Sequence, residues 1–403
     1  MQLTDQIYSM NPHWEDVRYD FKFSRAQLKE LISTLDKPFI TTMIGPRRVG
    51  KTVLMKQMIQ HLIDSKINRN RIFYFSFDEY RADIFNVIKE WARALSLDLR
   101  NGNYWVFFDE IQYVDDWAKN VKILYDNYPN IKLVISGSAS AHLKRGGESL
   151  AGRELQYKIY PLTFNEYAEF RRKRFISEEI KWNEYLNYMK RQLPALALYD
   201  IDPAQYVKEI VDKYVGYDIP QLFDVEDVDS LRTIFRIICK SPGEIIKAEN
   251  LASELGINRL TVSKYLNALE DSFLIRKVYN YSKNPRKSEK RSKKIYPYFT
   301  TLHEYVRPYI PEFSFLAETE VAFQTNAEYF WNENWREIDF IVGEQLDVGI
   351  EVKMKKRITN KDIKWLLNPP FRLSKKIVVV PYNSETNIEG ANAISLHSLS
   401  EVL

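Results

Sequence analysis

The segment from Gly45 to Thr52 constrains the fold of this chain more than any other feature. It reads G-P-R-R-V-G-K-T and matches the pattern G-x-x-x-x-G-K-[ST]. A run with strand character precedes it, from Pro38 to Ile44, and a helix-period segment follows it, from Thr52 to Ser65. A glycine-rich turn between a strand and a helix is typical of P-loop nucleotide-binding folds, whereas a chance glycine loop would lack this context. The sequence therefore predicts an α/β nucleotide-binding domain.

The residue types of this loop fit a bound triphosphate. Gly45 and Gly50 allow the backbone N–H groups to turn toward a phosphate, and the start of the following helix adds a favourable dipole. Lys51 is expected to reach the β- and γ-phosphates of ATP, and Thr52 to coordinate Mg²⁺. The residues expected to contact the nucleotide are Gly45, Pro46, Arg47, Arg48, Val49, Gly50, Lys51, Thr52 and Val53.

A second apolar run ends in two carboxylates. Its sequence, Y-W-V-F-F-D-E, ends at Asp109 and Glu110. Asp109 is predicted to hold the Mg²⁺ shell and Glu110 to polarise the attacking water, with a helix cap at a strand end as the alternative. Ser136, in V-I-S-G-S-A-S, ends the next run. Its hydroxyl is expected to reach the γ-phosphate or the water, although Ser-Gly-Ser is also ordinary turn chemistry.

The first half of the chain alternates short apolar runs with longer helix-period segments, which predicts a parallel sheet with crossover helices. The runs are nearly continuous in apolar residues, as expected of strands buried on both faces. They span Pro38 to Ile44, Arg71 to Phe77, Tyr104 to Phe108, Lys132 to Ser136 and Leu155 to Tyr160.

Length and composition bound the remaining possibilities. A chain of 403 residues predicts two to four domains. The single cysteine, Cys239, cannot form an internal disulfide, and no signal or long apolar stretch is apparent, so we expect a soluble cytoplasmic protein without a membrane partner. A net charge of +4 is too balanced to indicate nucleic-acid binding by itself.

Two apolar-periodic segments flank a turn at Gly256 with the spacing of a helix-turn-helix. In the second segment Leu260, Val262, Leu266 and Leu269 are expected to face a core, leaving Arg259, Thr261, Ser263 and Lys264 near the helix start for DNA. A lid or a protein-docking module is the alternative. A basic run follows, with seven basic residues and one acidic residue from Lys283 to Lys294, and it predicts a connector or a wing tip.

The last hundred residues contain a helix around Phe315 to Phe323, a β-hairpin from Glu337 to Lys353 and a strand from Lys376 to Val380. A hairpin centred on Gln345 pairs Asp339 with Glu351 and places Lys353 on the same face. Both carboxylates could then share a divalent metal ion. The alternative is a solvated hairpin face on which Glu337 pairs with Lys353.

The chain resembles prokaryotic, largely archaeal, AAA+ P-loop ATPases with a winged helix-turn-helix and a C-terminal restriction-endonuclease-like domain. The resemblance rests on N-P-H-W, G-P-R-R-V-G-K-T, F-F-D-E-I-Q, S-G-S-A-S, L-A-G-R-E and Y-P-L-T-F-N-E-Y, in this order. A Gly-Gly-x-Pro-like lid signature of the family is replaced here by R-Q-L-P at Arg191 to Pro194.

The resemblance implies roles for further residues. Arg153, just before the fifth strand, would act as an arginine finger toward a neighbouring subunit of a homo-oligomer, with a surface ion pair as the alternative. Asp339, Glu351 and Lys353 would form the D…E-x-K site of a metal-dependent nuclease, with Glu318 as a fourth member in preference to Glu320.

The expected architecture is a P-loop AAA+ parallel sheet followed by four further parts. We expect an ATPase core over 1–163, a helical lid over 164–224, a winged helix-turn-helix over 225–281, a basic linker or wing over 282–294 and an endonuclease-like α/β domain over 295–403. The leading hypothesis is an ATP-hydrolysing, Mg²⁺-dependent machine acting on DNA. The rival is a nucleotide-switched signalling or scaffold protein whose C-terminal domain only binds a partner.

Overall fold

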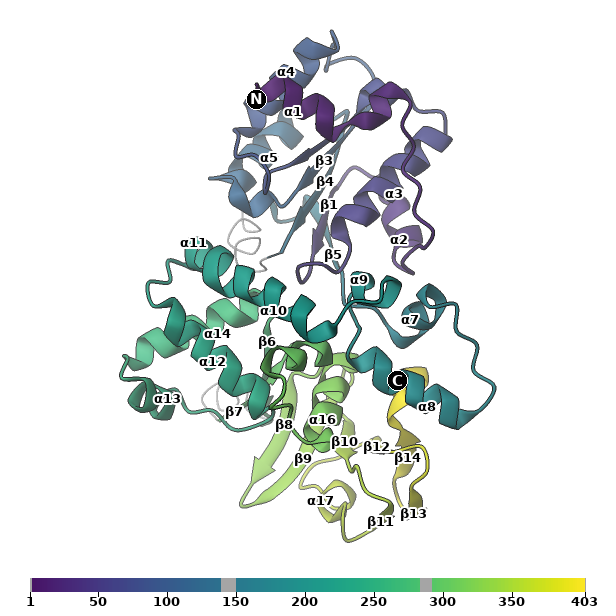
Figure 1. The fold of residues 1–403 in the computed structure, drawn as a ribbon, viewed down its shortest axis with the longest axis vertical. Coiled ribbons are helices and arrows are strands. Elements are labelled where there is room, and N and C mark those ends of the chain that lie inside the picture. The colour runs from purple at the N-terminus through teal and green to yellow at the C-terminus, as the bar shows by residue number, and fades with distance from the viewer. Residues whose placement is uncertain (1, 139–149, 283–291, 403) are drawn as a thin grey trace. The chain divides into compact units, whose positions relative to one another are not determined.

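The computed structural model describes residues 2–138, 150–282 and 292–402. The chain divides into two compact units, Met1–Pro161 and Leu162–Leu403, and each is described by itself (Figure 1). Within the described residues, no helix has both the length and the apolar character that crossing a membrane requires.

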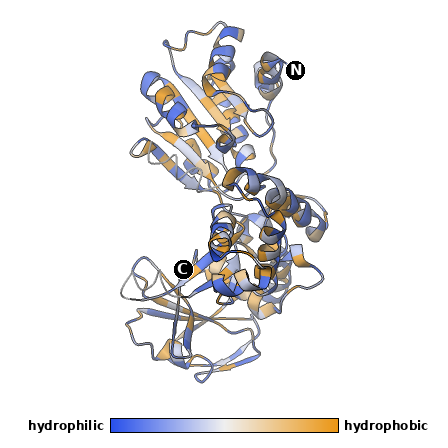
Figure 2. Ribbon diagram, turned by 90° about the vertical axis from the view of Figure 1, so that its left-hand side faces the viewer, coloured by the Kyte–Doolittle hydropathy of each residue, from blue (hydrophilic) through white to orange (hydrophobic). Residues whose placement is uncertain are grey.

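The first unit is built on a five-stranded, entirely parallel sheet with strand order β2-β3-β4-β1-β5. All five predicted strands are confirmed. The central strands β1 and β3 are buried along their whole length because helices cover both faces of the sheet, and Figure 2 shows hydrophobic residues along this sheet. The strands are β1 (Ile40–Ile44), β2 (Ile72–Ser76), β3 (Tyr104–Asp109), β4 (Ile131–Gly137) and β5 (Glu154–Lys158).

Helices connect these parallel strands, as crossover geometry requires. α4 shows why such a segment folds: Asp83 caps its first turn, and Val87, Ile88 and Trp91 repeat at helical spacing and are buried. The helices are α1 (Leu3–Met10), α2 (Leu28–Ile32), α3 (Lys51–Asp64), α4 (Ile84–Ala94) and α5 (Trp117–Asn127), with 3-10 turns η1 (Pro12–Glu15), η2 (Arg69–Arg71) and η3 (Ile111–Tyr113).

The edge strand β2 is covered by side chains of the N-P-H-W segment. Asn11 donates to the Tyr74 carbonyl and accepts from the Tyr74 N–H, at 2.9 and 2.7 Å. His13 and Trp14 both contact the Ile72 carbonyl at 3.0 Å. Side chains thus satisfy backbone groups that an unpaired edge would expose.

The second unit begins with the predicted helical segment. Pro194 and Pro220 interrupt the helical pattern of this segment in the sequence, and both lie in the first turns of helices, where a missing N–H has little cost. The elements are α7 (Phe164–Phe170), α8 (Glu178–Met189), α9 (Pro194–Leu198), α10 (Pro203–Lys213), the π-helical turn η4 (Tyr214–Asp218) and α11 (Ile219–Phe223).

The predicted helix, turn and helix are present. α12 (Val228–Lys240) precedes α13 (Ala248–Leu255), and Gly256 ends α13 with a φ of 66°. Asn258 then caps α14 (Arg259–Asp271).

One expectation for α14 was wrong. Val262, Leu266 and Leu269 are buried, but Leu260 is 75% exposed. At 3.6 residues per turn, positions 260 and 262 lie about 200° apart on the helix, so they cannot share a face. Tyr265 and Ala268 complete the buried face instead.

The rest of the second unit is a mixed seven-stranded sheet with order β14-β12-β10-β9-β8-β6-β7. The helix around Phe315 to Phe323, the hairpin and the strand Lys376 to Val380 are confirmed as α16 (Phe313–Gln324), β9–β10 and β12. The remaining elements are β6 (Ile275–Asn280), β7 (Lys293–Pro297), η5 (Thr300–Val306), β8 (Tyr329–Glu333), β9 (Arg336–Val342), β10 (Val348–Val352), β11 (Arg357–Thr359), α17 (Lys364–Leu367), β12 (Lys375–Val380), β13 (Glu385–Asn387), β14 (Asn392–Ser395) and η6 (Leu396–Glu401).

The end of the predicted linker or wing lies in this sheet. Lys293 and Lys294 lie in β7, which pairs with β6, and β6 also pairs with β8. Strand β6, expected to close the helix-turn-helix unit, therefore belongs to the same sheet as the C-terminal strands. Most of the basic run, residues 283–291, lies outside the described residues.

Candidate functional site

The predicted phosphate-binding loop lies between β1 and α3. A Cβ atom at Gly45 would lie 2.0 Å from the Ile159 carbonyl oxygen, so only glycine fits where the loop leaves the strand. Gly50 has a φ of 100°, which also favours glycine, and it precedes the first residue of α3. The loop therefore leads directly into a helix N-terminus, the geometry that suits a phosphate.

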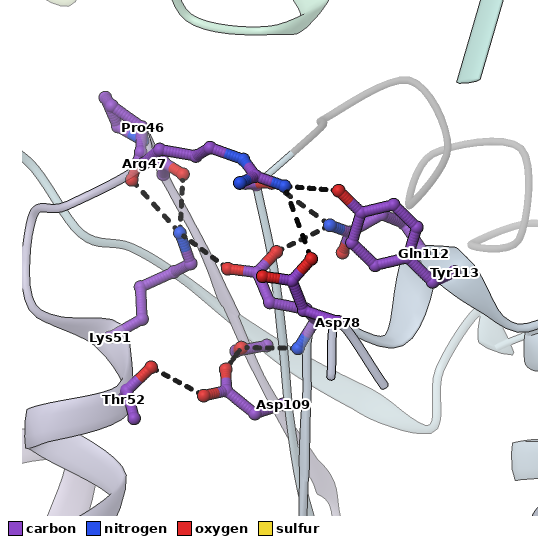
Figure 3. A network of polar contacts seen from close by, with 12 residues as sticks. Pro46, Arg47, Lys51, Thr52, Asp78, Asp109, Gln112 and Tyr113 are labelled. Atoms are coloured by element: carbon purple, nitrogen blue, oxygen red, sulfur yellow. Dashed lines mark hydrogen bonds and ion pairs between the residues drawn. The ribbon is translucent and has the colours of Figure 1, made fainter. Parts of the chain in front are cut away.

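Lys51 is buried within this loop. Its Nζ donates to the carbonyl oxygens of Gly45 and Pro46, both at 3.0 Å, and lies 3.7 Å from Oε1 of Glu110 (Figure 3). Burial lowers the pKa of Lys51, while the carboxylates of Glu110 and Asp109 oppose that shift. A phosphate would replace the carbonyl oxygens as a stronger partner for this ammonium group.

Asp109, at the end of β3, collects three hydroxyl groups. Thr52 donates to its Oδ2 at 2.5 Å, Tyr74 donates to the same oxygen at 2.9 Å, and Ser136 donates to Oδ1. Burial and the neighbouring Glu110 charge raise the pKa of Asp109. Thr52 and Asp109, both predicted near Mg²⁺, are thus in direct contact.

The oxygen atoms of Thr52 and Asp109 fit a Mg²⁺ ion, which prefers oxygen ligands. Mg²⁺ sites usually have only one or two carboxylate ligands, and waters and substrate phosphates complete the coordination shell. Ser136 lies in the site as predicted. In the structure it also accepts the Glu110 N–H at 3.2 Å. Its expected contact with the γ-phosphate or the water stays a prediction.

Glu110 has an unusual backbone conformation, and the side chains of Gln112 and Lys51 contact its carboxylate. Its φ of 51° is unusual for a residue with a side chain. Gln112 donates to its Oε2 at 2.5 Å and to the Ser138 hydroxyl at 3.0 Å. Although burial raises the pKa of Glu110, the charges of Lys51 and Arg47 outweigh burial and lower it, so the group is ionised. An ionised carboxylate can orient water.

Sequence reasoning missed three residues around the loop. The only sequence feature that could have identified Gln112 as a site residue is its place in the F-F-D-E-I-Q motif, two positions after Glu110. Tyr74 contacts Asp109 from the neighbouring strand, and no sequence motif identified it as a site residue. Arg25 is buried and donates to the carbonyls of Val49 and Tyr160, at 2.8 and 3.0 Å, so it ties the loop to the chain after β5.

The other predicted loop residues are placed as follows. Arg47 donates to the Tyr113 hydroxyl, and its NH2 lies 3.9 Å from Oδ1 of Asp78 (Figure 3). Arg48 has a φ of 66°, as expected of a tight loop. Val49 is buried and Val53 is 36% exposed.

Arg153 precedes the edge strand β5, as predicted. Its Nε lies 3.1 Å from Oδ1 of Asp126, and both side chains are partly exposed. The surface ion pair that we considered as the alternative is therefore present. A role toward a neighbouring subunit stays a prediction, and such an exposed pair is weak enough to exchange partners.

A second group of charged residues, which we call the carboxylate cluster, lies on the seven-stranded sheet. The β9–β10 register pairs Ile350 with Phe340, which places Glu351 opposite Asp339 as predicted. Asp339 and Glu351 are only 6% and 4% exposed, so the alternative of a solvated hairpin face is wrong. The cluster comprises Lys294, Tyr296, Glu318, Glu337, Asp339, Glu351 and Lys353.

Two lysines compensate the buried carboxylates. Lys353 Nζ lies 2.6 Å from Oε2 of Glu351 and 3.6 Å from Oδ2 of Asp339. Glu337, which the alternative paired with Lys353, instead pairs with Lys294 at 2.6 Å. The Val352 N–H donates to Oδ2 of Asp339 at 2.8 Å. Four carboxyl groups thus face two ammonium groups, an excess that favours one further cation.

The helical glutamate of the cluster is Glu318 and not Glu320. Glu318 accepts from the Tyr296 hydroxyl at 3.0 Å. Burial and the Asp339 charge raise its pKa to about 7. Glu320 lies in a separate buried group, where Thr300 and Gln192 donate to it at 2.6 and 2.8 Å.

Within the described residues, no group of three or more His, Cys, Asp and Glu side chains is arranged to hold a metal ion. A cation at the carboxylate cluster would therefore be held by Asp339 and Glu351 with backbone or water oxygens. Mg²⁺ sites with one or two carboxylates are common.

Two of the polar residues on α14 that we predicted to contact DNA already have partners within the chain. Arg259 Nε lies 3.0 Å from Oε1 of Glu249, and both side chains are exposed. Lys264 donates to the Asp224 carbonyl at 2.6 Å. Thr261 and Ser263 are half-buried, so the helix start presents fewer polar groups than its sequence suggests.

Comparison with known proteins adds to this geometry. Residues 37–168 match a family model described as an AAA domain, and this range includes the whole phosphate-binding loop, Asp109 and Glu110. Residues 192–304 match a domain of unknown function (DUF8612), which includes the helix-turn-helix. The AAA match supports an ATPase.

Several relatives are themselves uncharacterized. The chain is 28% identical over 310 residues to protein MJ1637 of Methanocaldococcus jannaschii, covering 69% of this chain and 64% of that protein. It is 28% identical over 267 residues to a protein of Haemophilus influenzae, covering 63% and 66%. The chain thus spans less than two thirds of the length of these relatives. The solved Walker-type ATPase PABY2304 of Pyrococcus abyssi aligns with 72% of this chain and 97% of its own, at 15% identity and a TM-score of 0.47.

Replacing Lys51 with Ala should abolish ATP turnover, because it removes the charge that faces the β- and γ-phosphates. Glu110→Gln should keep ATP binding and slow hydrolysis by roughly 10²- to 10⁴-fold, the usual contribution of a general base. Steady-state phosphate release and equilibrium nucleotide binding would measure both. The control is Lys89→Ala, an exposed lysine on α4. Normal turnover in Lys51→Ala would contradict this assignment.

Proposed function

We propose that this chain hydrolyses ATP in its first unit and acts on DNA, with a metal-dependent nuclease site at the carboxylate cluster of its second unit. The AAA match supports the ATPase part. The observation that carries the DNA part is the buried cross-strand pair Asp339 and Glu351 with Lys353 beside it. Phosphodiesters are the anionic substrate that such a cation-binding pair suits.

In the proposed ATPase reaction, the loop N–H groups and Lys51 would bind the phosphates. Thr52 and Asp109 would hold Mg²⁺, which would supply positive charge at the phosphate oxygens. Glu110 orients the water that attacks the γ-phosphate. Gln112 and Lys51 hold Glu110 in the structure, so these contacts must rearrange when a nucleotide binds.

In the proposed nuclease reaction, Asp339 and Glu351 would hold the metal ion, which supplies Lewis-acid activation of the scissile phosphate. We expected Lys353 to position or deprotonate water. Although burial lowers the pKa of Lys353, the carboxylates of Asp339 and Glu351 raise it, so the ammonium group keeps its proton. Lys353 would therefore position water or a phosphate oxygen. Glu318, with a pKa of about 7, is the better-suited proton acceptor.

DNA cleavage tests the nuclease assignment directly. The wild-type chain should cut supercoiled, linear or branched DNA with Mn²⁺ or Mg²⁺. Asp339→Ala and Glu351→Ala should lose at least about 100-fold in rate, because each removes half of the carboxylate pair. Glu320→Gln is the matched control, since it changes a buried helical glutamate outside the cluster. If the wild type cuts nothing, or the two alanine variants cut as fast as it does, the cluster is a structural ion network.

Substitution of Arg153 tests whether neighbouring subunits share ATP sites. Arg153→Ala should bind ATP normally and hydrolyse it poorly, because the guanidinium would neutralise charge at a neighbour's γ-phosphate. Mixing it with Lys51→Ala should restore part of the turnover, since one subunit then offers an intact Arg153 to another's intact loop. Asp126→Ala, which removes only the ion-pair partner, is the control. Mixed oligomers without any rescue would reject the finger role.

The rival function is a nucleotide-switched signalling or scaffold protein, in which ATP sets the assembly state. The rate of ATP turnover with and without DNA distinguishes this rival from the DNA hypothesis. We expect DNA to accelerate phosphate release several-fold, with single- and double-stranded DNA compared and the oligomeric state measured in parallel. A rate that neither DNA changes would favour the scaffold.

A further inference from the structure

The β8–β9 hairpin ends in an unusual turn. Glu333 pairs with Arg336, so only Asn334 and Trp335 connect the strands. Both have left-handed backbones, with φ of 52° and 65°. Two-residue turns of this kind favour Asn followed by Gly, because few side chains tolerate the second position. Tryptophan stands at that position here.

The side chain of Trp335 contributes little to the stability of the fold, because it is not buried. It is 98% exposed, although tryptophan is one of the side chains that folding most favours burying. A bulky residue at positive φ is an outlier that points to a role outside local folding. A partner that covers the indole ring would explain both features.

The surroundings of the turn indicate what kind of partner fits. Arg336 is exposed, and its guanidinium carbon lies 5.0 Å from the centre of the Trp365 ring on α17. The Lys364 Nζ lies 4.4 Å from the same ring. We call Trp335, Arg336, Lys364 and Trp365 the hairpin-tip patch. The acidic residue Glu333, at the end of β8, pairs with Arg336 across the turn.

An aromatic ring beside cations suits a nucleic-acid strand. Bases stack on exposed aromatic side chains, and Arg or Lys pairs with the phosphates between them. An apolar protein surface would leave these cations without a counterion. The charge therefore favours an anionic partner with flat rings over a second protein.

The same strand links the patch to the carboxylate cluster. Trp335 precedes Asp339 by four residues of β9, which is roughly 13 Å at the rise of an extended strand. That separation corresponds to about four stacked base steps. A DNA strand that reaches Asp339 could therefore also reach the hairpin tip.

We propose that the hairpin-tip patch grips a DNA strand beside the carboxylate cluster, with Trp335 stacked on an unpaired base and Arg336 and Lys364 on the phosphates. The proposal rests on the proposed action on DNA. It adds a contact that discriminates single-stranded from fully paired DNA, because an intact duplex hides its base faces.

Binding to labelled oligonucleotides without cleavage tests this proposal. Fluorescence anisotropy with the full chain in EDTA should show Trp335→Ala weakening single-stranded DNA binding roughly 5- to 100-fold, the range of one base–aromatic stack. Trp335→Phe, which keeps a ring, should stay within about threefold of wild type. Duplex binding should change less. Tyr199→Ala is the matched control, because Tyr199 is also an exposed aromatic of the second unit, at 62%.

A second readout is the indole emission of Trp335. Single-stranded DNA should quench it, and Trp335→Phe should remove that part of the quenching. Unchanged thermal unfolding of the variants would show that they fold. If wild type binds single-stranded DNA and Trp335→Ala binds equally well, the patch proposal is overturned while action on DNA stands. If wild type binds no single-stranded DNA in EDTA, the patch proposal is overturned, and DNA cleavage with Mn²⁺ or Mg²⁺ then decides separately whether the chain acts on DNA. Loss of self-association in Trp335→Ala with unchanged DNA binding would identify the patch as a protein contact and overturn the proposal.

Discussion

Burial of a parallel sheet on both faces is the constraint from which the first unit follows. The middle strands contact helices above and below, so a charged residue within them would have no water and no partner. The loop and the two carboxylates of the site lie at the carboxyl ends of the strands. There the phosphate-binding loop follows β1, Asp109 ends β3 and Ser136 lies near the end of β4. The site is thus a consequence of where the sheet permits polarity.

The second unit places charge differently. Asp339 is buried in the middle of β9, and Glu351 is buried on the adjacent strand β10, one residue before its end. Burying such carboxylates costs several kcal/mol each unless cations compensate them. Lys353 and Lys294 supply only part of that compensation, and burial together with the Asp339 charge raises the pKa of Glu318. A fold selected only for stability would gain by replacing such a cluster with apolar side chains, which argues that the cluster serves a function.

The seven-stranded sheet also changes how the second unit is understood. β6 follows directly after α14, and it lies between β7 and β8 in the sheet that carries the carboxylate cluster. Gly243, after α12, approaches that cluster too: a Cβ atom there would lie 2.9 Å from the Tyr296 ring and 3.1 Å from Glu318 Oε2. The segment between α12 and α13 therefore packs directly against the carboxylate cluster.

The sequence by itself determined the local features. The loop Gly45 to Thr52, the carboxylates at Asp109 and Glu110, the five buried runs and the hairpin register of Asp339 with Glu351 each follow from residue types within a few positions of one another. Periodicity of two or 3.6 residues fixes such neighbours without knowledge of the fold. Only the tertiary structure decided the contacts between distant segments. It brought Tyr74 and Ser136 to Asp109, moved the partner of Glu337 from Lys353 to Lys294, joined β6 to the C-terminal sheet and exposed Leu260. These depend on strand order and helix packing, because residues far apart in sequence meet only where the packing of whole elements brings them together.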